Sequence, residues 1–335
     1  MNIVKITRSQ EWWGYKIPPL LAIGYATTLH SGESMLATAP RLLFVMSAMV
    51  IGAAYVSVIN DITDMKEDLA SGKTNRMARL PPWLRGLLLG CTIAMGAGYI
   101  ATLYPHVWLM TIAAMPWIAF SLYSIPPFRL KKRGIWGAFS DASGAHVFTS
   151  LFLVAGMSYY THIPIDPVWM ASVGCWALAY GLRGILWHQF TDRDNDLQVG
   201  LSTFATQTDP SSFRGPARAL LALELLSLAV MLWRIGEPIP VLFLLLYLLF
   251  VIACTKRLGI AFINIMTPAG RPYHIFMGDY YQVFFPISLL LTSALVYPSG
   301  WIVLLVHVLL FSGNIVTLLR YTFRVFRTMR AFVRK

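Results

Sequence analysis

Charged residues are scarce in this chain. Asp, Glu, Lys and Arg make up 13% of it, about half of the ~25% that is usual in soluble domains. Hydrophobic residues reach 57%, and the mean hydropathy is +0.61. Too few polar residues therefore exist to cover soluble domains or to keep a chain disordered. Cysteine is scarce too. Because Cys91, Cys175 and Cys254 form no C-x-x-C pair, a disulfide-stapled fold is excluded and buried free thiols are predicted.

Long hydrophobic runs take the place of that missing polarity. A membrane-spanning helix needs about 20 mostly apolar residues, and ten stretches approach this length. They run near residues 17–37, 41–60, 84–103, 107–125, 142–160, 168–190, 217–233, 239–255, 280–298 and 301–319. Charged residues before the first stretch interrupt any early apolar core, so no signal peptide is expected. We predict an all-α, polytopic membrane helix bundle of nine to ten transmembrane helices, forming a single domain over residues 1–335.

The distribution of basic residues predicts the orientation in the membrane. Among 27 Lys and Arg residues, Arg41 and Arg234 alone lie near the turns that follow odd-numbered spans, and Arg183 lies within a span. Because Lys and Arg concentrate in cytoplasmic loops, the opposite face is expected to be cytoplasmic. The net charge of +12 then reflects topology, and no nucleic-acid partner is expected. A basic amphipathic helix after the last span predicts contact with anionic membrane lipid. Its basic residues are Arg320, Arg324, Arg327, Arg330, Arg334 and Lys335.

The acidic residues cluster in two places. Seven of 15 lie in N-D-I-T-D-M-K-E-D, after the second predicted span, and in D-R-D-N-D, after the sixth. On helices, Asp61, Asp64 and Asp68 would share one stripe, and so would Asp192 and Asp196. Like charges on one face repel each other, and acids oppose the dipole at a helix C-terminus, so bound cations would stabilise both segments. Ligand sets made only of oxygen favour Mg²⁺, which usually retains substrate phosphates in its shell. The predicted metal ligands are Asn60, Asp61, Asp64, Asp68, Asp192 and Asp196.

Basic residues beside these acids suit a phosphorylated ligand. The segment G-K-T-N-R follows the first acidic cluster and supplies Lys73 and Arg76. The loop after the fourth span carries Y-S-I-P-P-F-R-L-K, in which the two prolines end the helix and stiffen the chain. Tyr123, Arg129 and Lys131 of this loop are predicted to bind that phosphorylated ligand, whereas the adjacent Lys132 and Arg133 are assigned to topology.

The motifs N-D-x-x-D-x-x-x-D, Y-S-x-P-P-x-R-x-K and D-x-x-x-D, in this order, resemble the UbiA-type intramembrane prenyltransferase superfamily. The resemblance covers about residues 10–205 and implies a helix bundle around a central cavity that opens sideways to lipid. It implies an isoprenyl diphosphate held with Mg²⁺ at two Asp-rich motifs, and a basic residue on the first helix, here Lys16, that helps to hold the diphosphate. The catalytic residues that it implies are Asp61, Asp64, Asp192 and Asp196. Nine spans are usual in the family, against the ten counted here.

No nucleophile constellation accompanies these motifs, and none is needed if Mg²⁺ turns the diphosphate into a leaving group. An aromatic or lipid acceptor would then receive the prenyl group. The alternative is a transmembrane terpene cyclase, which needs no second substrate. His188 and Gln189 are candidates to position an acceptor or to take a proton. Arg183 should face the interior, as a structural partner or a phosphate contact.

A transporter is the rival class of protein, since it also carries intramembrane acids. It predicts acids at mid-span and an inverted repeat, whereas here the acids close the spans on one side. We therefore expect an enzyme of the bacterial inner membrane with its site at the cytoplasmic face. The prenyl chain length and the identity of the acceptor are left open by the sequence.

Overall fold

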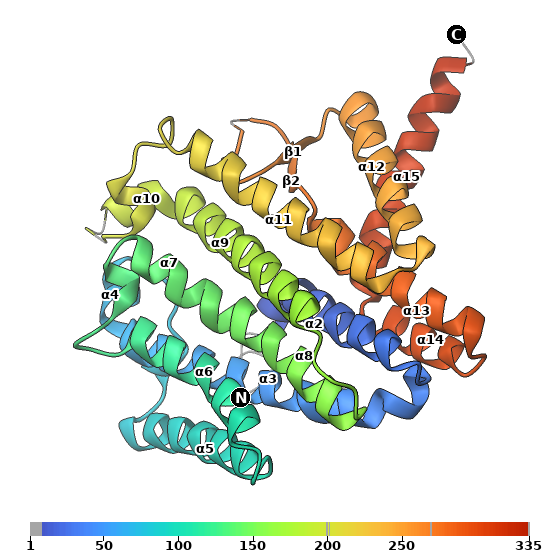
Figure 1. Cartoon of the computed structure of the whole chain (residues 1–335). Helices are drawn as coiled ribbons and strands as arrows, with labels where there is room; N and C mark the ends of the chain where they lie inside the picture. Colours follow the sequence, from blue (N-terminus) through green and yellow to red (C-terminus); the bar gives the residue numbers. More distant parts are fainter. Residues whose placement is uncertain (1–8, 199, 201, 269, 334–335) are drawn as a thin grey trace.

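Helices account for nearly the whole chain in the computed structural model, which describes residues 9–198, 200, 202–268 and 270–333 (Figure 1). The longer helices are α2 (Ser9–Ser31), α3 (Met35–Thr63), α5 (Pro82–Ala101), α6 (Val107–Ser124), α8 (Phe148–Tyr160), α9 (Pro167–Gln198), α11 (Arg214–Ile235), α12 (Pro238–Leu258), α13 (Phe285–Val296), α14 (Gly300–Leu310) and α15 (Ser312–Val333). The shorter ones are α4 (Met65–Ala70), η1 (Met77–Arg79), η2 (Leu130–Lys132), α7 (Ile135–Ala142), η3 (Ser143–Val147), α10 (Phe204–Gln207) and η4 (Tyr280–Phe284). A small parallel pair, β1 (Ala261–Ile263) and β2 (Tyr273–Ile275), interrupts them. The predicted all-α class is confirmed.

Among the residues that the structure describes, five helices are long and apolar enough to cross a membrane, namely α3, α5, α6, α11 and α12, and the bent pair of α14 and α15 adds a sixth if it counts as one span. Helix occupies much of every predicted span, but the predicted count of nine to ten is not confirmed by length and hydropathy. The remaining helices carry features that weaken them as spans. The η4–α13 segment is short, α2 contains two prolines, and α9 extends into the second acidic motif.

The first and the last predicted spans have different boundaries in the structure. The first was placed at 17–37, but α2 ends before Gly32, whose φ of 68° lies in the left-handed region that favours glycine. The side chain of Ser34 then caps α3 by accepting a hydrogen bond from the N–H of Ala37 at 3.2 Å. The last was placed at 301–319, but the helix breaks at Phe311 and α15 leaves α14 at 79°.

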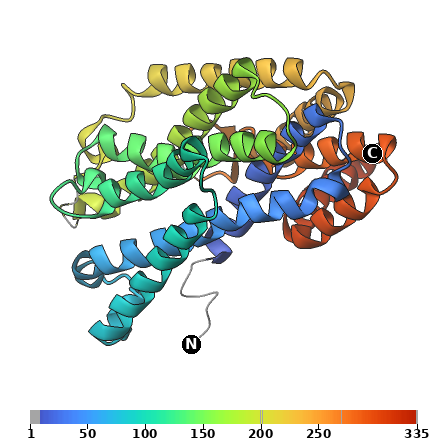
Figure 2. The same cartoon turned by 60° about the horizontal axis from the view of Figure 1, so that its bottom comes forward.

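Helix α9 lies at the centre of the arrangement and packs against α11, α7 and α8, while α2 packs against α8 and α13 (Figure 1). Figure 2 shows α5 on the outside of the bundle beside α3, its main contact.

The prediction that all three cysteines are buried is wrong for two of them. Cys254 is buried and free, but Cys91 on α5 and Cys175 on α9 are exposed, because outward faces of both helices have no protein cover.

A buried ion pair fixes α9 to α11. Both carboxylate oxygens of Glu224 accept hydrogen bonds from Arg183 Nη1 at 2.7 Å, and the Tyr281 hydroxyl donates to Glu224 Oε1 at 3.0 Å. Arg183 Nη2 also donates to the carbonyl of Phe276 at 2.8 Å. Arg183 is therefore a structural partner, one of the two roles that the sequence left open. The pair holds α9 in register just before the helix reaches His188 and the second acidic motif.

Candidate active site

A polar cavity of about 290 Å³ lies where the α3–α4 junction, the loop after α6 and the end of α9 meet. Its lining holds acidic, basic and uncharged polar side chains that come from both acidic motifs and from the basic loop. The lining residues that carry these groups are Asp64, Glu67, Asp68, Lys73, Tyr123, Lys131, Lys132, His188, Gln189, Asp192, Asp196 and Thr203. The structure thus brings to one cavity motifs that are more than 120 positions apart in the chain.

The first acidic motif sits on an interrupted helix. Asp64 ends α3 and precedes α4, with φ −96° and ψ −4°, so the predicted single helical stripe is wrong. The break turns Asp64 and Asp68 into the cavity lining, while Asp61 is fully buried and is not part of that lining. Asn60 is also outside the lining, and its Oδ1 accepts a hydrogen bond from the hydroxyl of Ser124 at the end of α6.

A buried asparagine that the sequence argument missed ties this motif together. The side-chain amide of Asn75 donates to the carbonyl of Asp61 and to Asp68 Oδ2, both at 2.8 Å. Its own Oδ1 accepts from the N–H of Ala78 at 3.0 Å. Asn75 belongs to G-K-T-N-R, the segment in which the sequence argument singles out only the two basic residues. It orients the Asp68 carboxylate and anchors the loop that carries Lys73.

The basic loop reaches across to the first motif. Arg129 has a φ of 38°, and its guanidinium donates to the carbonyl of Thr63 at 2.9 Å and pairs with Asp64 at 3.2 Å and Glu67 at 3.0 Å. Lys131 also pairs with Asp64, and Lys132 pairs with Glu67 at 2.5 Å. The assignment of Lys132 to topology alone therefore misses its place in the cavity.

The second acidic motif lies on the last turns of α9, which stays helical to Gln198. Asp192 and Asp196 line the cavity from one stripe, as their spacing predicts, whereas Asp194 is exposed. His188 Nδ1 lies 3.5 Å from Asp192 Oδ2, and Thr203 Oγ1 lies 3.5 Å from Asp196 Oδ2. Burial raises the pKa of Asp196, partly offset by Lys73 across the cavity, and Asp192 raises it further.

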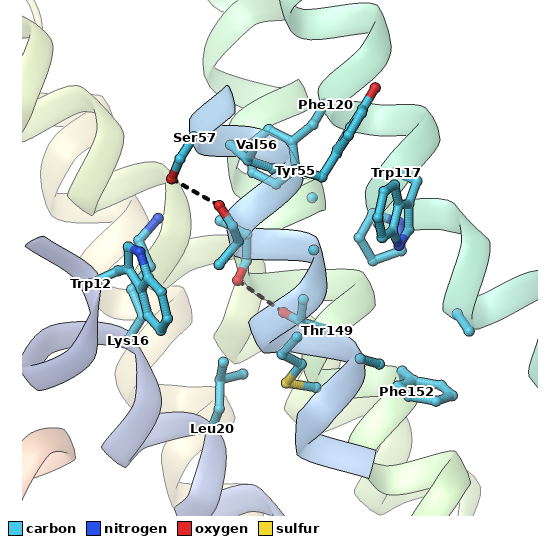
Figure 3. Close-up of a pocket in the computed structure, with 18 of the residues that line it drawn as sticks. Trp12, Lys16, Leu20, Tyr55, Val56, Ser57, Trp117, Phe120, Thr149 and Phe152 are labelled. Carbon is cyan, nitrogen blue, oxygen red and sulfur yellow. Dashed lines mark hydrogen bonds between the residues drawn. The ribbon is translucent and has the colours of Figure 1, made fainter. Parts of the chain in front are cut away.

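A second cavity, of about 130 Å³, is almost wholly apolar (Figure 3). It is enclosed by α2, α3, α6 and the η3–α8 segment, and Figure 3 shows Leu20, Trp117 and Phe152 around it. The hydroxyls of Ser57 and Thr149 on its wall donate to carbonyls of their own helices at 2.8 and 2.9 Å, which leaves little polar surface for a ligand.

The apolar and polar cavities are lined by neighbouring residues of the same helices. Phe120 of the apolar cavity and Tyr123 of the polar one lie one turn apart on α6, with ring centroids 6.4 Å apart. Helix α3 likewise contributes Ser57 to the first cavity and then continues to Asp64 at its end. Lys16 lines the apolar cavity from α2 and is not among the residues that line the polar cavity.

Most of the predicted site residues therefore meet, and some do not. The polar cavity gathers Asp64, Asp68, Lys73, Tyr123, Lys131, His188, Gln189, Asp192 and Asp196. Besides Lys16, four predicted site residues are not part of the lining, namely Asn60, Asp61, Arg76 and Arg129. Arg129 forms ion pairs with two residues of the lining, Asp64 and Glu67. Glu67, Asn75 and Thr203 were not predicted. Glu67 stands inside the first motif and could have been included from its position.

The donor chemistry of the polar cavity fits Mg²⁺. In the part of the chain that the structure describes, no group of three His, Cys, Asp or Glu side chains is close enough to hold a metal by itself. The carboxylates instead line one cavity from two elements, with Asp64 and Asp68 from the α3–α4 segment and Asp192 and Asp196 from α9. Mg²⁺ commonly takes only one or two carboxylates per ion and completes its shell with substrate phosphates and water. The arrangement suits a metal that arrives together with a phosphorylated ligand.

Comparison with known proteins decides the family. The model of the UbiA prenyltransferase family matches residues 17–264. This chain belongs to that family. The chain is also similar in fold to a UbiA homologue from Archaeoglobus fulgidus, solved with GPP and Mg²⁺, at a TM-score of 0.58 and 13% identity over 90% of this chain and 99% of that one. The same homologue with DMAPP and Mg²⁺ gives a TM-score of 0.53 over 91% and 99% of the two chains. No curated protein matches the sequence.

Membership in the UbiA family confirms the resemblance seen in the motifs, and the chain is an integral membrane protein with several long apolar helices. The family match ends at residue 264, shortly before β2, so α13, α14 and α15 lie outside it. The similarity to the solved homologue is a similarity of fold, and the ligands bound there are properties of that protein.

Proposed function

We propose that this protein is a Mg²⁺-dependent prenyltransferase that binds an isoprenyl diphosphate across the two cavities. The observation that carries the proposal is their adjacency. A cavity lined by carboxylates and amines adjoins an apolar cavity through α3 and the Phe120–Tyr123 turn of α6. This is the shape of an amphiphile with a multiply charged head and a hydrocarbon tail. The bound GPP and DMAPP of the Archaeoglobus homologue support the same substrate class.

The residues of this chain supply binding, orientation and charge. Asp64, Asp68, Asp192 and Asp196 would hold the metal, which when bound neutralises the diphosphate and makes it a better leaving group. Lys131, Lys132 and Lys73 point to the same cavity and would take up charge that develops on the departing oxygens. The carbon–oxygen bond of the prenyl diphosphate breaks, and its electron pair leaves with diphosphate.

The allylic cation left behind lies toward the apolar cavity. Tyr55, Trp117 and Phe120 line this cavity, and the ring centroids of Tyr55 and Trp117 are 4.5 Å apart. Aromatic faces attract cations, and an apolar wall excludes the water that would quench the cation. An aromatic or lipid acceptor would then form the new bond and lose a proton. His188 and Gln189 line the polar cavity and are placed to orient that acceptor or to receive the proton.

The distribution of basic residues supports a site at the cytoplasmic face, and we extend the proposal to the inner membrane of a bacterium. The decisive assay uses membranes that contain the overexpressed protein, with labelled prenyl diphosphates of several lengths and either Mg²⁺ or EDTA. Membranes carrying Asp192→Ala serve as the matched control. Mg²⁺-dependent consumption that requires an added aromatic or lipid acceptor supports prenyl transfer, and the mass of the adduct identifies the acceptor class.

Other outcomes of this assay contradict the proposal in different ways. A hydrocarbon or terpene alcohol formed without acceptor would show a cyclase instead of a transferase. No consumption of any prenyl diphosphate, by a protein that retains its fold, would contradict the use of this substrate class altogether.

A further inference from the structure

Helix α15 (Ser312–Val333) presents three distinct faces, and only one of them is covered by protein. It turns away from α14 by 79° and runs beside α12 toward the C-terminus (Figure 1). Val325 is buried with Cys254 and Ile260, and the ring of Tyr321 stands edge-on to His274 with centroids 4.8 Å apart. These contacts fix how the helix is rotated about its own axis.

The second face is apolar and exposed. Val316, Leu319, Phe323 and Phe326 follow a spacing of three and four residues, so they form one stripe. Phe323 is 70% exposed and Phe326 is 56% exposed. Two uncovered aromatic side chains on one stripe mark a surface that contacts something apolar.

The third face is basic. Arg320, Arg324 and Arg327 are exposed and lie on a stripe that is rotated by about a quarter turn from the apolar one at ~3.6 residues per turn. The guanidinium carbon of Arg324 lies 5.7 Å from the ring centroid of Tyr321, which is itself held by the covered face. The sequence of α15 contains no Asp or Glu that could neutralise these charges within the helix. Arg334 and Lys335 lie outside the described residues, as does the side chain of Arg330.

We propose that α15 binds the anionic phospholipid headgroups of the membrane in which the protein sits. Its apolar stripe would enter the boundary between headgroups and acyl chains, and the arginine stripe beside it would pair with lipid phosphates. The charge of this surface is complementary to an anionic leaflet, and its width of one apolar stripe suits an interfacial helix. The helix lies beyond the region that matches the family model, so the proposal is independent of the prenyl-transfer site.

The test uses the full-length protein with Cys91→Ser, Cys175→Ser and Phe323→Cys, labelled at the new thiol with a polarity-sensitive fluorophore. Cys254 is buried and is left in place. The labelled protein is reconstituted in phosphatidylcholine vesicles with or without about 30% phosphatidylglycerol, an anionic content in the range that creates a surface potential. We expect an apolar, lipid-quenchable environment in the anionic vesicles, weakened by high salt.

A charge variant tests the arginine stripe. Arg320→Gln/Arg324→Gln/Arg327→Gln should lower the selection of phosphatidylglycerol over phosphatidylcholine by roughly fivefold for each arginine. The control that removes equal charge from other exposed positions, Arg214→Gln/Arg218→Gln/Lys256→Gln, should retain the selection.

Three results would overturn the proposal. These are a fluorophore exposed to water in both vesicles, equal lipid selection by both charge variants, and tight binding of transfer RNA without lipid selection. If the triple variant does not fold, the salt dependence measured on the otherwise unchanged chain decides the question.

Discussion

The Asn75→Ala substitution tests whether the polar cavity is a metal–diphosphate site more sharply than removing an acid. Asn75 is buried and touches no ligand, because it is not part of the cavity lining. Its amide orients the Asp68 carboxylate at 2.8 Å and holds the Asp61 carbonyl at the same distance. We expect the variant to fold with Asp68 present but free to turn away from the cavity, so the loss should appear in metal dependence.

The expected magnitude follows from two independent arguments. Losing the outer partner of a metal ligand typically costs about 10–100-fold in metal affinity or activity. Losing a hydrogen bond to a charged group costs about 1.5–3 kcal/mol, and about 1.4 kcal/mol corresponds to tenfold in an equilibrium constant. Both arguments give a rise of roughly one to two orders of magnitude in the Mg²⁺ concentration for half-maximal turnover.

The assay measures turnover of a prenyl diphosphate against Mg²⁺ concentration, together with the thermal unfolding midpoint of each variant. Asn314→Ala is the matched control, since Asn314 donates one hydrogen bond to the carbonyl of Gly14 at 2.7 Å, away from the cavity. An unchanged Mg²⁺ requirement in a folded Asn75→Ala protein would refute the reasoning. A loss of stability with no change in the metal dependence of the folded fraction would make Asn75 purely structural.

Four further predictions concern the same cavities. Asp192→Ala should abolish turnover while expression and thermal stability stay near normal. A large drop in the thermal stability of this variant would show instead that the acid serves the fold. Because Lys16 lines the apolar cavity and not the polar one, Lys16→Met should leave KM for the prenyl diphosphate nearly unchanged, whereas a rise of about tenfold, which corresponds to ~1.4 kcal/mol of lost charge attraction, would show that Lys16 binds the diphosphate. Because burial raises the pKa of Asp196 above its ordinary value, protons should compete with Mg²⁺ at a higher pH than they would for an ordinary Asp. Titration of Mg²⁺ affinity against pH should show this earlier loss in the unchanged protein but not in Asp196→Asn, and identical profiles would contradict it. Calorimetry should show a non-hydrolysable geranyl diphosphate analogue binding with Mg²⁺ and only weakly with EDTA, whereas equal affinities would argue against a metal-dependent site.

The helices and the meeting of the two motifs were predictable because each depends on local sequence. Apolar runs of the right length mark helices, and acids at the ends of the second and sixth runs place both motifs on one face. The prediction that Asp192 and Asp196 share one stripe is confirmed, because α9 continues to Gln198 without a break. The same spacing argument was wrong for Asp61, Asp64 and Asp68, because the chain interrupts the helix at Asp64.

Other features depend on contacts that a single sequence does not encode locally. The partner of Arg183 is Glu224, 41 positions away on another helix, and nothing in either residue's neighbourhood points to the other. The role of Asn75 depends on its hydrogen bonds to Asp68 and Asp61, which lie 7 and 14 positions earlier in the chain and are brought close by a turn. The bend at Phe311 was missed because hydropathy alone continues smoothly from α14 into the start of α15.

The charge balance of the polar cavity supports the proposal that metal and diphosphate bind together. Five carboxylates line it, on Asp64, Glu67, Asp68, Asp192 and Asp196, against three lysines. Arg129 and Lys131 together engage Asp64, so part of the positive charge is already used by the protein's own acids. A bare diphosphate would enter a cavity that is acidic overall and would be repelled. Divalent cations held by the carboxylates of both motifs would offset that negative charge, and a cation at Asp64 would release Arg129 and Lys131 to pair with phosphate oxygens. The same acids that would repel the substrate alone would therefore favour it when it arrives with its metal.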